Sequence, residues 1–330
     1  MSGAPFVPLV QAIRDDLVES VHYGLAVICD DRGQIVESWG AADERIVLRS
    51  AGKPFQAAHF VAAGAADGYR ADDRELAVAI GSHGGAPEHV AAVESLMRKT
   101  EVDVRQLKCG THPPLDRSAR TLARRSGPTV LQNNCSGKHV AMVAGASHLG
   151  HPIETYLAAV HPWQRGIKSL FAEAAGVAED SIDWVTDDCG APSLVVEALA
   201  AARAYAALAA GRDESMRRVW RAATGHPLMI AGRDRLETDL MEMFPGRVVA
   251  KSGAEGVYAI AVKDRDAGRA AIVKIADGDD RRARTAASIF LASRLLELEK
   301  EERDQLERKY LPATKTLTGR PVGRTVCIAG

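Results

Sequence analysis

The sequence is poor in the features that mark secreted, membrane-spanning or disulfide-rich proteins. Its 330 residues include only five cysteines, an odd number spread along the chain, and aromatic residues make up 5%. Such cysteines are typical of free thiols or metal ligands rather than of a disulfide framework. No apolar run reaches the length of a membrane span, and the first residues lack the basic start and apolar core of a signal peptide. We therefore expect a cytoplasmic protein.

The chain also lacks an excess of charge of either sign. Lysine and arginine total 42, and aspartate and glutamate total 43, which gives a net charge of −1. A nearly neutral chain has no general electrostatic attraction for nucleic acid. Hydrophobic residues make up 46%, and the length is sufficient for a large buried core. We expect a globular protein with no nucleic-acid partner and no membrane partner.

Strand-like segments occupy both ends of the sequence, and helical segments occupy the middle. β-Branched and apolar runs predict strands over 18–29, 34–40, 45–49, 247–262 and 269–275, with Gly268 in a turn. Apolar and alanine-rich periodicity predicts helices over 54–63, 72–80, 117–125, 140–146, 161–175 and 193–210, and one long helix over 281–309. The tail, 314–330, is expected to add one short strand or to stay irregular.

This order predicts an α+β fold in one domain spanning 1–330. An antiparallel sheet is expected from both chain ends, with flanking helices, in a mixed part made of residues 1–60 and 245–330. Residues 60–245 are expected to form a mostly helical part.

A serine and a lysine three residues apart, Ser50 and Lys53, open the first predicted helix. Residues with this spacing lie one above the other on a helix face, so the lysine amine is expected to reach the serine hydroxyl. A neutral amine can take the hydroxyl proton and leave an attacking alkoxide. The structural alternative is that Ser50 caps the helix and Lys53 points into water.

Two later stretches favour the catalytic interpretation. Ser82 lies in a glycine-rich loop, and Lys251-Ser252-Gly253 lies on a predicted strand. An S-x-x-K motif followed by K-[ST]-G is the motif pairing of serine β-lactamases and penicillin-binding proteins, which carry out acyl transfer. A second Ser–Lys pair, Ser82 with Lys251, would serve the leaving nitrogen. A second lysine nearby would also depress the pKa of Lys53 by like-charge repulsion. Backbone N–H groups near Ser50 are expected to form an oxyanion hole.

Two of the cysteines, Cys135 and Cys189, lie in polar loops and suggest a metal site. Two thiolates suit zinc, with a third ligand from Lys138, His139 or Asp188 and an open position for substrate. From spacing alone, His139 is the preferred third ligand, because histidine is a commoner zinc ligand than lysine. The structural alternative is two unrelated buried thiols.

Five stretches in order resemble the rhizobial-type (class 3) L-asparaginases, over nearly the whole chain. They are Arg49-Ser50-Ala51-Gly52-Lys53-Pro54, Gly81-Ser82-His83, Asn134-Cys135-Ser136-Gly137-Lys138-His139, Asp187-Asp188-Cys189-Gly190 and Ala250-Lys251-Ser252-Gly253-Ala254-Glu255-Gly256. The resemblance implies a fold similar to that of serine β-lactamases and glutaminases. It also implies hydrolysis of L-asparagine to L-aspartate and ammonia by a homodimeric enzyme.

The resemblance also assigns roles to individual residues. It implies a catalytic set in which Ser50 is the nucleophile, Lys53 its base, and Ser82 and Lys251 the second Ser–Lys pair. It implies zinc bound by Cys135, Lys138 and Cys189, and so replaces His139 with Lys138 as the third ligand. Around the substrate it places Arg49, Asn134, His139, Asp187, Gly253 and Glu255.

Two other functions remain open at the level of sequence. One is a glutaminase or another serine amidohydrolase on the same scaffold. The other is a non-catalytic protein that binds zinc or an amino acid, in which Ser50 only caps a helix.

Overall fold

The larger sheet of the protein is antiparallel and draws its strands from both ends of the chain. The computed structural model describes residues 4–265 and 267–329. The strand order is β10-β11-β1-β2-β9-β8-β7, and β3 pairs with β2. The strands are β1 (Val7–Arg14), β2 (Leu17–Cys29), β3 (Ile35–Trp39), β7 (Val248–Gly253), β8 (Val257–Asp264), β9 (Ala267–Ile275), β10 (Thr314–Lys315) and β11 (Pro321–Cys327). The α+β fold class predicted from the sequence is confirmed.

Helices cover both faces of this sheet. Gly268 of β9 faces helix α8 (Ala198–Ala210), whereas the next residue, Arg269, donates to the carbonyl of Leu295 in α12 (Ala283–Leu296). Because successive side chains of a strand point to opposite faces, α8 and α12 cover opposite faces of the sheet.

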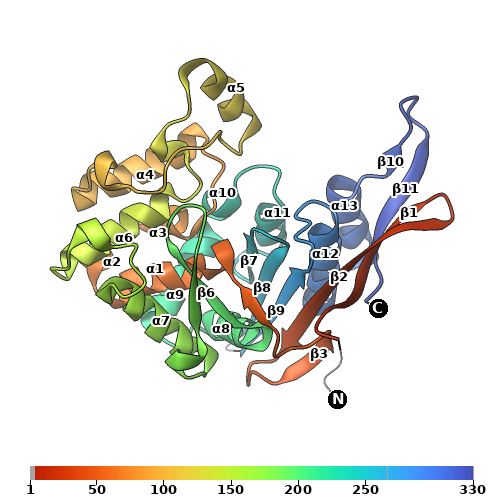
Figure 1. Ribbon diagram of the computed structural model, residues 1–330, viewed down its shortest axis with the longest axis horizontal. Helices are drawn as coiled ribbons and strands as arrows, with labels where there is room; N and C mark the ends of the chain where they lie inside the picture. Colours follow the sequence, from red (N-terminus) through yellow and green to blue (C-terminus); the bar gives the residue numbers. More distant parts are fainter. Residues whose placement is uncertain (1–3, 266, 330) are drawn as a thin grey trace.

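The middle of the chain is a helical layer at the β7 end of the sheet (Figure 1). Its helices are α1 (Lys53–Ala62), α2 (Ala65–Gly68), α3 (Asp73–Ile80), α4 (Pro87–Thr100), α5 (Arg117–Ser126), α6 (Ser136–His148), α7 (Pro162–Ala175), α9 (Glu214–Gly225), α10 (Pro227–Ala231) and α11 (Leu236–Met243). Helix α6 is buried from Ser136 to Ala146, as expected of a central helix with apolar residues on every side. None of the helices in the described ranges is long and apolar enough to cross a membrane.

Several predicted boundaries are wrong. The segment 193–210 is not one helix, because Pro192–Glu197 forms strand β6 between β4 (Arg45–Val47) and β5 (Asp183–Thr186). The apolar run Leu194-Val195-Val196 satisfies its backbone by pairing with β4 and β5, and the helix starts only at Ala198.

The C-terminal region also differs from its prediction. The helix expected over 281–309 is two helices, α12 and α13 (Lys300–Tyr310), since Glu297 has a left-handed backbone with φ 54° and ends the first. Gly268 lies inside β9 rather than in a turn. The tail forms β10 and β11, and β11 pairs with β1, a strand that the sequence analysis did not predict.

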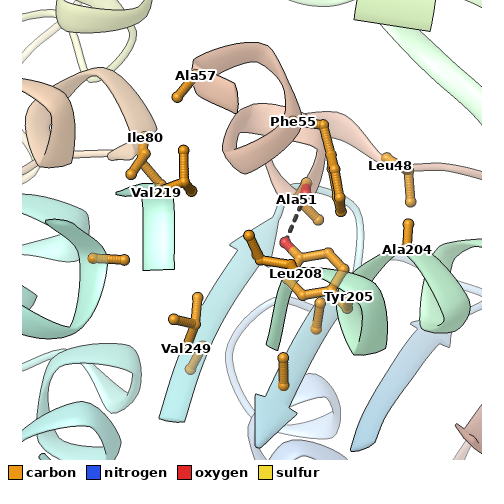
Figure 2. Packing of buried hydrophobic residues seen from close by; sticks show 14 of the residues in the cluster. Leu48, Ala51, Phe55, Ala57, Ile80, Ala204, Tyr205, Leu208, Val219 and Val249 are labelled. Carbon is orange, nitrogen blue, oxygen red and sulfur yellow. Dashed lines mark hydrogen bonds between the residues drawn. The ribbon is translucent and has the colours of Figure 1, made fainter. Parts of the chain in front are cut away.

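A buried aromatic cluster anchors the start of α1 to α8. The Tyr205 hydroxyl donates to the Ala51 carbonyl at 2.6 Å, and Figure 2 shows this bond beside the Phe55 ring. The Phe55 ring packs edge-to-face against Tyr205 at 5.4 Å and against Phe171 at 5.0 Å. Ser50 and Lys53, on either side of Ala51, are therefore held by the core.

Gly268 allows α8 to approach the sheet closely. A Cβ atom at this position would lie 2.1 Å from the Ala206 carbonyl oxygen and 2.6 Å from the Ala210 nitrogen. We predict that Gly268→Ala lowers the free energy of unfolding by about 1–3 kcal/mol, because backbone atoms must move to admit the methyl group. Urea denaturation measures this change.

Gly225 provides the matched control. It ends α9, and a Cβ atom there would meet nothing within 4 Å. Gly225→Ala should leave stability unchanged or raise it by up to ~1 kcal/mol. Equal effects of the two substitutions would contradict the close approach at Gly268.

Candidate active site

A cavity of about 380 Å³ opens where the helical part meets the end of β7. Its walls come from the short 3-10 helix η1 (Arg49–Gly52), from the loops before α5 and α6, and from the β5–β6 loop. Seven of the residues singled out in the sequence line it: Arg49, Ser50, Asn134, Cys135, Asp187, Asp188 and Cys189. The fold thus brings together residues that are up to 140 positions apart, since 189 minus 49 is 140.

Beneath this cavity, one serine hydroxyl lies between two buried lysine amines. Lys53 Nζ donates to Ser82 Oγ at 3.0 Å, and Lys251 Nζ donates to the same oxygen at 2.9 Å. Lys53 is 0% exposed and Lys251 is 1% exposed. The three residues come from the start of α1, the loop after α3 and strand β7. The second Ser–Lys pair and the first lysine therefore form one cluster.

The loop after α3 is shaped to present Ser82. The Ser82 N–H donates to the Ile230 carbonyl at 2.8 Å. A Cβ atom at Gly81 would lie 2.3 Å from the Met229 carbonyl oxygen, so only glycine allows α3 to end this close to α10. The carbonyl of Gly81 in turn accepts from Lys53 Nζ at 2.7 Å.

Ser50 and Lys53 do not make the contact that their spacing predicts. In the described part of the chain, the acceptors of Lys53 Nζ are Gly81 O, Ser82 Oγ and, at 3.0 Å, Asn134 O. The two carbonyls accept two amine protons, and the Ser82 hydroxyl can accept a third or donate to the amine when it is neutral. Tertiary acceptors from two other segments therefore outcompete the local serine. The half-buried Ser50 faces the cavity instead.

The surroundings make both amines poor proton binders. Burial lowers the pKa of Lys53. Burial, together with the positive charge of Lys53, lowers the pKa of Lys251 well below the usual value of a lysine. Loss of hydration disfavours the charged form, and a neighbouring cation does so further. Both amines are therefore more readily neutral than the amine of an exposed lysine.

Arg49 is held in a fixed orientation at the mouth of the cavity. Its backbone is left-handed, with φ 50°, and its N–H donates to Ser193 Oγ at 3.0 Å. Its guanidinium donates to Asp187 at 2.6 Å and to Asp188 at 2.5 Å. The Asp187 side chain is 9% exposed, whereas that of Asp188 is 91% exposed. The pairing with Asp188 therefore contributes little to stability.

The two thiols and Lys138 meet at the floor of the cavity. Lys138 Nζ donates to Cys189 Sγ at 3.1 Å, and the Cys135 thiol donates to Asn134 Oδ1 at 3.3 Å. Interaction with the Cys189 thiol lowers the pKa of the Cys135 thiol, and the positive charge of Lys138 lowers it further. The nearest carboxylate oxygen belongs to Asp187, 3.9 Å from Lys138 Nζ.

This set of donors is chemically suited to a divalent metal. Within residues 4–265 and 267–329, no three His, Cys, Asp or Glu side chains converge in a way that could hold a metal ion. The predicted set differs in that its nitrogen donor is a lysine. Two soft thiolates and one amine nitrogen are ligands that zinc accepts, provided that all three are deprotonated.

Three predicted substrate residues lie outside the cavity wall. His139 is fully buried, and its Nδ1 bonds to the Tyr156 hydroxyl at 2.6 Å, while its Nε2 has no partner in the described part of the chain. Gly253 closes the end of β7, where its carbonyl accepts from Arg284 at 2.9 Å. Glu255 is exposed in the β7–β8 turn with φ 60°. Between the last two, Ala254 reaches the cavity.

The sequence analysis missed His112, Cys109 and Tyr156. His112 lines the cavity, and its Nε2 accepts from the Asn134 N–H at 3.1 Å. Cys109 lines the same wall, and the Tyr156 hydroxyl accepts from the Lys108 N–H. The irregular run Cys109-Gly110-Thr111-His112-Pro113-Pro114 was a sequence signal for the first two.

The cavity and the cluster beneath it bring hydroxyl, thiol, carboxylate and amine groups together, a combination typical of enzyme active sites. A model of the L-asparaginase II family matches residues 10–327, and the chain belongs to this family. The family resemblance predicted from the sequence is confirmed, and membership supports the expected enzyme class, an amidohydrolase.

Two further comparisons add little detail. A search of the curated proteins gave no match. Among solved structures, the native form of Mglu is similar to this chain, with 15% identical residues and a TM-score of 0.36. The match covers 84% of this chain and 65% of the Mglu chain, so this chain spans less than two thirds of that protein.

The lysine cluster predicts a linked titration. We predict that Lys53→Met raises the pKa of Lys251, because the substitution removes the adjacent positive charge while burial persists. The pKa should rise toward the usual value of a lysine without reaching it. A pH titration of the Lys251 side chain by 13C NMR measures this shift. Lys300→Met, on an exposed helix end, should leave that titration unchanged. An unchanged Lys251 pKa in Lys53→Met would contradict the coupling.

Proposed function

We propose that this chain is a cytoplasmic, homodimeric L-asparaginase that hydrolyses L-asparagine to L-aspartate and ammonia through an acyl-enzyme. The observation that carries the proposal is the Ser82 hydroxyl between two buried amines, directly beneath a cavity lined by Ser50. Membership of the L-asparaginase II family supports the substrate. The neutral amines that base catalysis needs are consistent with the lowered pKa values of Lys53 and Lys251.

Ser50 is the proposed nucleophile because its side chain lines the cavity and Ser82 does not. Its hydroxyl attacks the side-chain amide carbon, and its proton passes to the neutral amine of Lys53. Catalytic hydrogen bonds are often long in unliganded structures and tighten in the substrate complex. The separation of Ser50 from Lys53 is therefore compatible with this role.

The cluster of Lys53, Ser82 and Lys251 is the proposed path for the proton. Collapse of the tetrahedral intermediate breaks the carbon–nitrogen bond, and the nitrogen leaves as ammonia after taking the proton delivered through the Ser82 hydroxyl. Water then attacks the Ser50 ester and gives a proton to the same amines. The bond between the acyl carbon and Ser50 Oγ breaks, Ser50 Oγ takes that proton back, and aspartate is released. The hydroxyl is suited to this relay because it can accept from one amine while donating to the other.

Arg49 and Asp187 are the proposed partners of the α-carboxylate and α-ammonium groups of the substrate. They now bind each other at 2.6 Å, as two halves of a site for a zwitterion would. Arg49 can exchange its bond to the exposed Asp188 for a substrate carboxylate at little cost.

Cys135, Lys138 and Cys189 are the proposed zinc ligands. When bound there, zinc would act as a Lewis acid that orients the substrate. His139, immediately after Lys138 on α6, is held by Tyr156 and is proposed to support the ligands from behind.

Loss of either serine should stop the reaction. We predict that Ser50→Ala lowers turnover by several orders of magnitude, because no nucleophile remains. Ser82→Ala should lower it by about 10²–10⁴-fold, because the proton relay is broken. Ammonia release from L-asparagine, with L-glutamine in parallel, is the measurement.

Ser181→Ala is the control, since this exposed side chain only bonds to the nearby Ala178 carbonyl. It should retain full activity. Full activity in Ser50→Ala would exclude the mechanism. Ammonia release from L-glutamine alone would show that L-glutamine, and not L-asparagine, is the substrate.

The five cysteines provide an internal test of the metal site. We predict one zinc per chain by elemental analysis of the purified protein, and its loss in Cys135→Ala and in Cys189→Ala, because each removes a thiolate. Cys29→Ala and Cys327→Ala should retain the metal, since these thiols lie on β2 and β11. Equal zinc content in all four variants would contradict the site.

A further inference from the structure

A second cavity, of about 240 Å³, lies on the far face of the sheet from the lysine cluster. It is enclosed by the start of α11, by Tyr258 of β8, by the start of α12 and by Tyr310 at the end of α13. Figure 1 shows these elements grouped beside β7 and β8. Its volume is below the roughly 300–1,000 Å³ of pockets for drug-sized ligands, which limits an occupant to a small molecule.

Strand β7 separates this cavity from the proposed active site. Lys251 points to Ser82, so the next side chain, Ser252, points to the opposite face. Ser252 pairs in register with Tyr258, which lines the second cavity together with Glu237. The two cavities can therefore be filled at the same time.

The second cavity contains buried polar groups that have no partner. Tyr258 is 2% exposed and Glu237 is 3% exposed. The Tyr258 hydroxyl and Glu237 Oε1 make no hydrogen bond in the described part of the chain. A buried polar atom without a partner costs about 1–3 kcal/mol, so such groups in a cavity wall favour the binding of a polar ligand or an ordered water.

Arginines supply the complementary charge. Arg235, Arg281 and Arg284 line the cavity, against the carboxylates of Asp234, Glu237 and Asp280. Arg284 is bound to Asp280 at 2.6 Å and to the Gly253 carbonyl. Among residues 4–265 and 267–329, the guanidinium groups of Arg235 and Arg281 form no ion pair. A purely anionic ligand would be repelled by the Glu237 carboxylate, and a purely cationic ligand would be repelled by the arginines.

We propose that this cavity binds a small zwitterionic α-amino acid, at a site distinct from the one that hydrolyses substrate. The carboxylate of the ligand would accept from Arg235, Arg281 and the Tyr258 hydroxyl. Its ammonium group would donate to Glu237 Oε1. Each unpartnered group then gains a partner of the correct type, and the charges of the wall and ligand balance.

Calorimetric titration of the full chain with L-aspartate tests the proposal. We expect two binding events per chain in the wild type, one at each cavity. Tyr258→Phe and Arg281→Gln should each weaken the binding event at the second cavity by about tenfold or more, because a hydrogen bond to a charged group is lost. Tyr258→Phe should keep the melting temperature of the wild type, because the deleted hydroxyl has no partner in the ligand-free protein.

Arg282→Gln is the matched control, since this neighbouring exposed arginine bonds to Thr314 outside the cavity. It should leave both events unchanged. Arg49→Met should remove only the event at the proposed active site, so a failure of the proposed catalytic function is distinguishable from a failure of the second site. The proposal would be overturned if neither Tyr258→Phe nor Arg281→Gln weakened any binding event seen in the wild type.

Discussion

The shared bond of two buried amines to one serine hydroxyl is the constraint on which the rest of the structure depends. Ser82 Oγ lies 3.0 Å from Lys53 Nζ and 2.9 Å from Lys251 Nζ. Two ammonium groups at this separation, both shielded from water, would repel each other, and the burial of each charge costs several kcal/mol of free energy. A neutral amine relieves both costs. The cluster joins the helical part to the sheet, so the two parts must pack together to form it.

The elements predicted correctly from the sequence are those whose conformation follows from the preferences of their own residues. Runs of β-branched residues predicted β2 and β9 within a few positions, and Asp72 begins α3 with a capping box. The run predicted over 247–262 contains both β7 and β8, which form an antiparallel pair. The failures lie where a distant partner decides. Strand β6 precedes an alanine-rich helix and was joined to it, because only pairing with β4 and β5 makes Leu194-Val195-Val196 extended. Strand β1 likewise depends on β2 and β11.

The same distinction applies to the candidate site. Residue types and motif order selected the segments that meet at the cavity, but helical spacing predicted the wrong partner for Lys53. Three acceptors from other segments surround its amine, and local geometry contains no information about them. Lys138 illustrates the same limit. Spacing favoured His139, whereas the fold binds that ring to Tyr156 and brings the lysine to Cys189. His112 was overlooked because its contact with Asn134 spans 22 positions.

Strand β7 shows how one short motif can serve both faces of a sheet. Lys251 reaches Ser82, Ser252 faces the opposite side of the sheet, and Gly253 lies at the strand end. A Cβ atom on Gly253 would lie 2.6 Å from the Leu48 carbonyl oxygen, so glycine is required for β7 to pass beside the chain that leads to Ser50. Threonine stands at the middle position of the corresponding β-lactamase motif. Here the serine keeps the hydroxyl, on the face of the sheet opposite the Lys251 amine. Three consecutive residues thus supply an amine on one face, a hydroxyl on the other face and a close approach to Leu48 at the strand end.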